Sequence, residues 1–445
     1  MNGGLFKSAS RFALVAAAGL LAGGVAAQAA DLGGNCCADL EERVAELEAT
    51  TARKGNRKVK LTVSGQVNEA LMFWDDGKET NAYIVSNNMS RTRFRFVGDA
   101  KINSDWSAGY LLEIGVRYAN SGNRNQNTSN AGGESNSLDI RHSAWWIDSK
   151  QLGRIWVGQT STATDGITEI NLANAITGGI DASAWQGGFF LRNNDGSLNS
   201  RKWNDVTPSQ AGAWGVGEGD RNNVVKYVSP TFAGFTVQAA WGEDDQWDAA
   251  LRYAGEFSGI RVAAGAGYRQ INDNFGKSGA DGPRCADNGG GVSSAVDCNS
   301  IGLSGSVMHV ATGLYVHGAW GQLEDKNRKP LLGAFAKDKE TSWYLQAGIE
   351  QNFFGIGKTT LFGEYGNYEA GSGLTANGAG YNGFISADTT VWGIGLTQGI
   401  DAAAMDLYVG YKHFDTDIVG LPAGATNVKG KQEFDAVVMG GIIRF

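Results

Sequence analysis

The segment WSAGYLLEIGVRY, residues 106–118, alternates large apolar side chains with polar, small or charged ones. Tyr110 and Leu112 fall on one face of an extended chain, whereas Glu113 and Arg117 fall on the other. Successive side chains of a β-strand point to opposite faces, so this segment is predicted to be a strand with one apolar and one wet face. Similar alternation runs through the rest of the chain from Lys60 onward, in stretches of about ten residues.

About sixteen such segments lie between Lys60 and Phe445. One set of connections consists of tight turns, and the other set consists mostly of long polar loops. This segregation is typical of transmembrane antiparallel β-barrels, in which an even strand number brings both ends to one rim. We therefore predict an all-β fold, a transmembrane barrel of about sixteen strands over residues 60–445, preceded by a short N-terminal helical segment. The predicted strands start near residues 60, 90, 105, 137, 152, 222, 233, 247, 259, 299, 311, 340, 358, 387, 403 and 432.

The composition favours a barrel over a helical membrane protein or a disordered chain. The 445 residues include 65 glycines, 5 prolines and 13 tryptophans, and the mean hydropathy is -0.24. Beyond the first segment no run of about 18 apolar residues is present, so no transmembrane helix is predicted. Without residues 1–29 the chain has 36 basic and 46 acidic residues, a net charge of -10, which argues against nucleic-acid binding.

The first 59 residues differ in pattern from the rest of the chain. In residues 1–29, Lys7 and Arg11 precede an apolar stretch that ends in Ala27-Gln28-Ala29, which predicts a signal peptide cleaved after Ala29. Residues 30–59 contain an acidic segment with the apolar spacing of about two coiled-coil heptads. It either supports an oligomer of barrels or forms a solvated arm. Adjacent Cys36 and Cys37 lack the small-residue pattern of a lipoprotein signal, so lipidation is not predicted.

Few residues suggest chemistry. Cys285 and Cys298 share one Gly- and Asp-rich loop, and in an exported protein a disulfide between them is favoured over two free thiols. The four histidines are scattered without ligand spacing, so neither a metal site nor a cofactor is predicted. No nucleophile lies close in sequence to a suitable base, so the chain is not predicted to be an enzyme.

Three stretches resemble the general porin family of Gram-negative bacteria. The chain ends in a strand with a terminal Phe, residues 437–445, and residues 223–235 resemble the central hairpin of that family. Residues 58–68, which follow the acidic segment, resemble the start of its alphaproteobacterial branch. The resemblance implies a sixteen-stranded homotrimer in the cell outer membrane, in contact with lipid and lipopolysaccharide. It implies passive diffusion of small hydrophilic solutes and ions, and assembly by the barrel-assembly machinery, which reads Phe445.

The same resemblance implies that the third long loop, residues 161–221, folds into the barrel and narrows it. This loop is the longest connection, and its acids Asp165, Glu169 and Asp181 are expected at the constriction. The facing wall should be basic, and alternation places several arginines inward, because an arginine facing lipid at mid-depth would cost about 2–4 kcal/mol. The arginines assigned to this wall are Arg91, Arg93, Arg95, Arg117 and Arg141, of which Arg141 has an ambiguous parity because Trp145 and Trp146 are adjacent. Charges opposed across a narrow, wet gap orient dipolar solutes.

Two alternatives stand beside general diffusion. A substrate-selective porin for sugars, phosphate or organic acids would need a run of lumen aromatics, and the inward candidates Trp156, Tyr315, Tyr344 and Tyr408 are dispersed. An outer-membrane enzyme or adhesin on the same barrel would show hydrolytic activity or a plugged lumen. General passive diffusion is the preferred interpretation.

Overall fold

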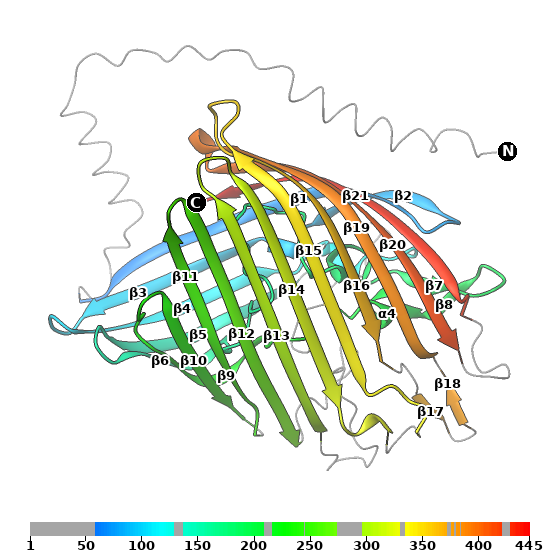
Figure 1. The fold of residues 1–445 in the computed structure, drawn as a ribbon, viewed down its shortest axis with the longest axis horizontal. Coiled ribbons are helices and arrows are strands. Elements are labelled where there is room, and N and C mark those ends of the chain that lie inside the picture. Colours follow the sequence, from blue (N-terminus) through cyan, green and yellow to red (C-terminus); the bar gives the residue numbers. More distant parts are fainter. Residues whose placement is uncertain are drawn as a thin grey trace.

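The fold is a closed antiparallel β-barrel, as the sequence predicted (Figure 1). The computed structural model describes residues 58–128, 137–208, 216–243, 245–273, 296–329, 334–371, 375–377, 380–382, 384–420 and 428–445. Within these ranges sixteen strand positions follow one another around the barrel. No helix in the same ranges is long and apolar enough to cross a membrane. The predicted signal peptide and almost all of the acidic segment lie outside the described residues.

Each barrel strand pairs with its neighbour in the chain, and the last strand, β21, pairs with β1 to close the barrel. β1 pairs with β3 over its first half and with β2 over its second half, so β2 and β3 share one position. The strands of the barrel are β1 (Lys60–Asp75), β2 (Thr80–Ser86), β3 (Arg93–Lys101), β4 (Trp106–Val116), β5 (Leu138–Ser149), β6 (Gly153–Ser161), β9 (Arg221–Val228), β10 (Phe235–Gly242), β11 (Trp247–Phe257), β12 (Ile260–Asp273), β13 (Val296–His309), β14 (Leu314–Asp325), β15 (Lys339–Gln351), β16 (Thr359–Ala370), β19 (Phe384–Ile400), β20 (Met405–Gly420) and β21 (Lys431–Arg444).

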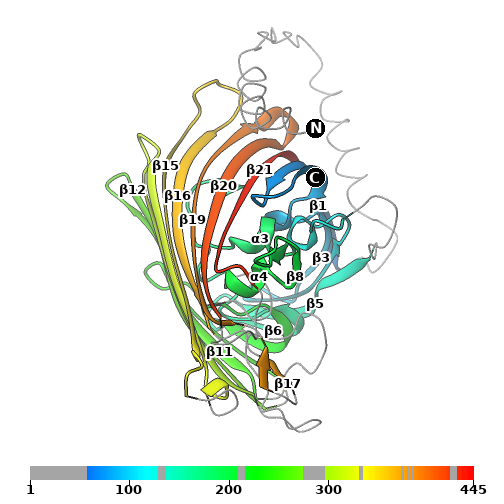
Figure 2. The same cartoon turned by 90° about the vertical axis from the view of Figure 1, so that its right-hand side faces the viewer.

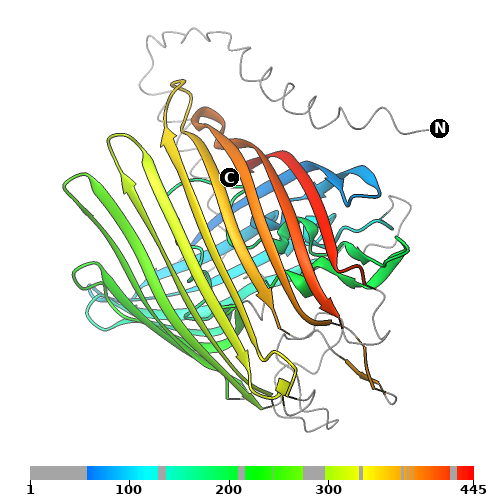
Figure 3. The ribbon, with the colours of Figure 1, turned by 45° about the vertical axis from the view of Figure 1, so that its right-hand side comes forward.

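Shorter elements occupy the connections. They are η1 (Asn88–Ser90), η2 (Ser121–Asn123), α3 (Ser183–Gln186), β7 (Phe190–Arg192), β8 (Leu198–Lys202), α4 (Trp203–Val206), β17 (Thr375–Asn377), β18 (Gly380–Asn382) and η3 (Asp401–Ala403). Tight turns lie along the rim that carries the C-terminus, whereas β17 and β18 belong to a long connection at the opposite rim (Figure 1 and Figure 3). The short turns and long loops are therefore separated as predicted.

All barrel strands except β2 begin within three residues of a predicted start, because turn residues mark the boundaries clearly. The sequence did not predict β2, which pairs with the second half of β1. At one of these turns β11 and β12 are joined by Ser258 and Gly259, with φ angles of 50° and 77°. Two consecutive left-handed residues make the type I′ turn that matches the twist of a two-residue hairpin. Glycine at the second position adopts this conformation without a steric penalty.

The two faces of the wall differ in polarity, which β1 illustrates. Val63, Val67 and Leu71 are exposed on the outer face, whereas Gln66 and Asn68 are buried on the inner face. Residues that pair across antiparallel strands share a face, so the register carries this division from β1 to its neighbours. An apolar outer face and a polar inner face suit a barrel that is surrounded by lipid and encloses water.

Candidate pore constriction

In the connection between β6 and β9, the described residues 162–208 and 216–220 run along the inner wall of the barrel. Near its start, the carboxylate of Asp248 in β11 accepts a hydrogen bond from the backbone N–H of Thr164 at 2.7 Å. Further along, the hydroxyl of Ser304 in β13 accepts one from the backbone N–H of Ile170 at 3.2 Å. The first part of the loop is thereby attached to β11 and β13.

The middle of the loop continues to the strands beyond β13. The backbone N–H of Asn174 donates to Glu350 of β15 at 2.7 Å, and that of Arg192 donates to Gln432 of β21 at 2.6 Å. Figure 2 shows α3 and α4 of this loop between the strands around β20 and β21 and those around β3 and β5. The loop therefore covers one half of the inner wall, from β11 to β21.

Aromatic side chains fix the later part of the loop. Three side chains are at most 1% exposed: Trp185 of α3, Phe189 between α3 and β7, and Trp203 of α4. The ring centroids of Phe189 and Trp203 lie 4.8 Å and 5.8 Å from that of Phe434 in β21. Full burial of a large apolar side chain contributes about 1.5–3 kcal/mol, so this cluster stabilises the attachment of the loop to the inner wall.

An ion pair lies beneath α3. Lys412 Nζ of β20 is 2.9 Å from Glu364 Oε1 of β16, and both side chains are only 2% exposed. Glu364 also accepts a hydrogen bond from the backbone N–H of Gly179 in the loop at 3.3 Å, and Lys412 Nζ lies 5.1 Å from the ring centroid of Trp185. The pair therefore connects two barrel strands to the middle of the loop.

Three of the arginines assigned to the basic wall, Arg93, Arg95 and Arg141, lie on the inner face of β3 and β5. Glu113 of β4, 1% exposed, accepts hydrogen bonds from Arg95 Nε at 2.7 Å and from Arg141 Nε at 2.6 Å. Arg93 pairs with the buried Gln66 of β1 and so shares the inner face. The alternation of the sequence thus placed Arg93 and Arg95 on the correct side.

The two remaining arginines of the wall share another carboxylate. Arg91 Nη2 and Arg117 Nε each lie 3.1 Å from Asp139 Oδ2 of β5. The five arginines and the carboxylates of Asp139 and Glu113 together leave a net charge of +3 on this wall. Neither carboxylate was predicted as a partner of the arginines, although Glu113 was assigned to the same face as Arg117.

A β-bulge resolves the ambiguous parity of Arg141. In the pairing of β4 with β5, Glu113 is opposite His142 and Ile114 is opposite Ile140, so Arg141 is the extra residue. After the bulge His142 and Trp146 are buried on the inner face, whereas Trp145 is 53% exposed on the outer face. Because the extra residue reverses the alternation, Arg141 and Trp146 both point inward despite their odd and even positions.

The predicted loop acids gather in the lumen. The protein that surrounds Glu169 inside the barrel, together with the carboxylates of Asp181 and Asp165, raises the pKa of Glu169 to about 7. The Glu169 side chain is nevertheless exposed to solvent, so protons and ions reach it through the lumen. Asp181 is 7% exposed, and Asp165 lies 4.0 Å from the guanidinium of Arg221.

Charged residues at the end of the loop, which were not among the predicted site residues, lie beside the same carboxylates. Glu218 Oε1 accepts hydrogen bonds from Thr168, and burial together with the carboxylate of Glu169 raises the pKa of Glu218. Arg221, the first residue of β9, interacts electrostatically with both Asp165 and Glu113. Arg221 therefore lies between the loop acids and the basic wall. A sequence signal existed, since a run of charges immediately precedes β9.

The other residues singled out by sequence have structural surroundings. Cys298 is buried and disulfide-bonded, and its predicted partner Cys285 lies outside the described residues, so this pairing stays a prediction. His142 Nδ1 is 3.1 Å from Thr160 Oγ1. Among the described residues, no group of three or more His, Cys, Asp and Glu side chains is placed to hold a metal ion.

A closed barrel that is apolar outside, polar inside and narrowed by a charged loop is the architecture of a membrane pore. Residues 13–418 match the family model described as Gram-negative porin. The chain belongs to the Gram-negative porin family and is a non-enzymatic outer-membrane channel. A search of curated proteins gave no significant match.

Solved structures with the same fold include three outer-membrane proteins. The anion-selective porin from Comamonas acidovorans has a TM-score of 0.56 at 16% identity, covering 87% of this chain and 100% of that chain. OmpF of Salmonella typhi, in complex with daunomycin, has a TM-score of 0.51 at 13% identity, with coverages of 88% and 99%. In-vitro folded OmpT of Vibrio cholerae has the same TM-score, identity and coverages. At these identities the likeness concerns the fold.

Proposed function

We propose that this channel is a general diffusion porin, whose constriction lies between the loop 161–221 and the arginine wall of β3 to β5. The observation that carries the proposal is the placement of charge. The wall has a net charge of +3, and the loop on the other half of the lumen contributes Asp165, Glu169 and Asp181. A transverse field across a water-filled gap favours hydrated, dipolar solutes, and transport needs neither a cofactor nor a chemical step.

Burial of the inward tyrosines supports general diffusion over a substrate-selective channel. Tyr315, Tyr344 and Tyr408 are 5%, 4% and 4% exposed, so little of each ring is available to a passing solute. Tyr315 OH donates to Gln346 at 3.0 Å and Tyr408 OH donates to Asn68 at 2.5 Å. These rings belong to the inner wall rather than to a continuous apolar path.

Reconstitution of the mature chain in planar bilayers tests this proposal. We expect a current that rises linearly with voltage, and no saturation by added sugars, phosphate or aliphatic organic acids. Arg93→Gln combined with Arg95→Gln should move the reversal potential in a salt gradient toward cation preference. The matched control is Arg261→Gln, because Arg261 is exposed at a rim and paired with Glu256 at 2.9 Å. Saturable block of the current by a sugar, phosphate or an aliphatic organic acid would favour the substrate-selective alternative and refute general diffusion.

Assembly and membrane partners form the second part of the proposal. We infer a homotrimer in contact with outer-membrane lipid and lipopolysaccharide, and conductance steps in threes would support the trimer. We assign Phe445 as the signal read by the barrel-assembly machinery. Its backbone exchanges hydrogen bonds with Gly65 at 2.8 and 3.1 Å, whereas its side chain is 63% exposed and accessible. Deletion of Phe445 should reduce the amount of protein in the outer membrane.

Residues 1–59 are assigned by sequence. We propose that residues 1–29 are a signal peptide removed on export, that residues 30–59 form the acidic helical segment and linker, and that the chain comes from the alphaproteobacterial branch of the family. The intact mass of protein purified from outer membranes tests the cleavage site after Ala29. Removal of residues 30–59 tests whether this segment strengthens the trimer, since trimer dissociation in detergent should then occur at lower temperature.

A further inference from the structure

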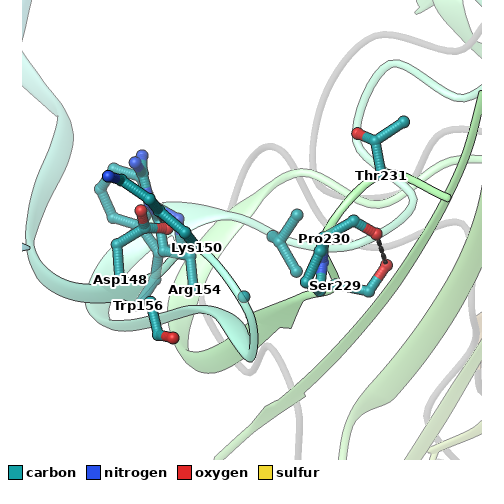
Figure 4. A pocket seen from close by; sticks show the side chains of 10 residues that line it. Asp148, Lys150, Arg154, Trp156, Ser229, Pro230 and Thr231 are labelled. Atoms are coloured by element: carbon teal, nitrogen blue, oxygen red, sulfur yellow. Dashed lines mark hydrogen bonds and ion pairs between the residues drawn. The ribbon is translucent and has the colours of Figure 1, made fainter. Parts of the chain in front are cut away.

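A cavity of about 460 Å³ lies at the rim of tight turns, outside the constriction. It opens between the turn that joins β5 to β6 and the turn that joins β9 to β10. Figure 4 shows Asp148, Lys150, Arg154 and Trp156 on one side of this cavity, and Ser229 and Pro230 on the other. Neither turn belongs to the loop that narrows the pore.

Arg154 and Trp156 face the inside of the barrel. In the pairing of β6 with β9, Arg154 is opposite Val228 and Trp156 is opposite Lys226, which is 8% exposed. Ile155 lies between them in sequence and is 43% exposed on the outer face. A solute that passes along the lumen therefore meets Arg154 and Trp156 near this rim.

The guanidinium of Arg154 is held in a fixed orientation. Its Nε donates to Asp148 Oδ1 at 3.0 Å, and its central carbon lies 4.2 Å from the ring centroid of Trp146 and 5.5 Å from that of Trp156. The two terminal amino groups have no hydrogen-bond partner among the residues that the structure describes, and the side chain is 35% exposed. A planar guanidinium with these two groups unoccupied matches the two oxygens of a carboxylate.

The surroundings add charge and an apolar surface. Lys150 is exposed at the mouth of the cavity, where its Nζ donates to the carbonyl of Ser104 at 2.6 Å, and Lys226 adds a second inward cation beside Trp156. Asp148 offsets one of the three positive charges. The half-buried indole of Trp156 lines the cavity and offers a flat apolar surface next to the carboxylate position.

We propose that this cavity is a binding site for small organic anions in which a carboxylate is attached to an aromatic ring. Arg154 binds the carboxylate through its terminal amino groups, Lys150 and Lys226 contribute attraction, and Trp156 contacts the ring. This site rests on the proposed function in one respect: the solute must reach the cavity through an open lumen. The site adds weak selectivity at one end of a channel that is otherwise non-specific.

Titration of the detergent-solubilised full chain with benzoate, followed by ligand-observed NMR with empty micelles as background, tests the site. We expect saturable binding, weakened about tenfold by Arg154→Gln, because a charge-assisted hydrogen bond to the carboxylate is lost. Arg154→Lys keeps the charge but loses the planar pair of donors, so it should weaken binding too. Trp156→Leu should also weaken binding, whereas the rim control Arg261→Gln should not.

Inorganic phosphate and benzyl alcohol separate the contributions of charge and ring. Phosphate and benzyl alcohol should each bind at this site much more weakly than benzoate does, and should therefore displace it poorly. Equal competition by phosphate would indicate a general anion site, equal competition by benzyl alcohol would indicate an apolar site, and either result overturns the proposal. Unchanged benzoate binding in Arg154→Gln would also overturn it. Conductance recorded without benzoate keeps the two proposals distinct, since a conducting channel that does not bind benzoate refutes this site alone.

Discussion

The ion pair beneath α3 allows a sharp test of how the constriction loop is held. Glu364→Gln keeps the shape of the side chain and one acceptor oxygen, but it removes the negative charge that faces Lys412 at 2.9 Å. Both side chains are 2% exposed, so the ammonium group would remain in the lumen wall without its charged partner. Loss of one member of a buried pair costs about 3–5 kcal/mol.

This cost should appear mainly as weaker attachment of the loop, because strand pairing holds the barrel independently. Glu364 accepts from the backbone N–H of Gly179, and Lys412 lies over Trp185, so both ends of the pair contact the loop. A cost of about 3 kcal/mol would increase the population of the detached loop roughly a hundredfold. In single-channel recordings we expect greater open-channel noise and more frequent partial closures.

A double-mutant cycle distinguishes the ion pair from a general packing defect. Lys412→Met combined with Glu364→Gln removes both charges, and replacing both members of a buried pair is often close to neutral, so the recordings should become quieter than with Glu364→Gln alone. As a control, Glu256→Gln removes an exposed pair with Arg261, which is worth about 0–1 kcal/mol. The reasoning is refuted if Glu364→Gln conducts as quietly as the unaltered protein, or if the double variant is as noisy as the single one.

Three further predictions concern charge and redox state. Arg93→Gln alone should shift the cation-to-anion permeability ratio about fourfold toward cations, since removing a unit charge at ~10 Å in water favours a cation and disfavours an anion by about 0.4 kcal/mol each; an unchanged reversal potential would place Arg93 away from the ion path. Because the pKa of Glu169 is raised to about 7, this residue gains negative charge as pH rises from 6 to 8, so cation preference should increase over that range. Glu169→Gln should remove this increase, and a variant with the unaltered pH profile would contradict the assignment. Peptide mass spectrometry should find Cys285 and Cys298 protected from alkylation until a reductant is added; labelling without reductant would exclude the disulfide.

Local pattern was enough to predict the barrel. Alternation in segments such as 106–118 specifies which residues face lipid, because the side-chain period of a strand is two. The lengths of the connections specify how consecutive strands are joined. Both signals are short-range, so the starts of all barrel strands except β2 could be placed within three residues. The same parity placed Arg93 and Arg95 on the inner face.

Alternation could not decide on which face of the strand Arg141 lies, because an extra residue opposite Glu113 and Ile114 reverses the alternation. No local property of residues 138–149 marks that bulge; it becomes visible only when β5 is aligned with β4. The carboxylates that accept hydrogen bonds from the wall arginines were not predicted either, because these contacts also depend on the alignment of neighbouring strands. Glu113 joins Arg95 and Arg141, which are distant in sequence and adjacent only across strands.

The sequence alone determined that this chain forms a closed barrel of alternating strands with one very long connection that carries several carboxylates. Only the tertiary structure decided where that connection lies, because its path from Asp248 to Gln432 depends on hydrogen bonds to side chains more than 80 residues away. The guanidinium of Arg154, aligned by Asp148 and two tryptophans, likewise depends on neighbouring strands. Alternation is a property of one strand, whereas a site in the lumen requires the register of many.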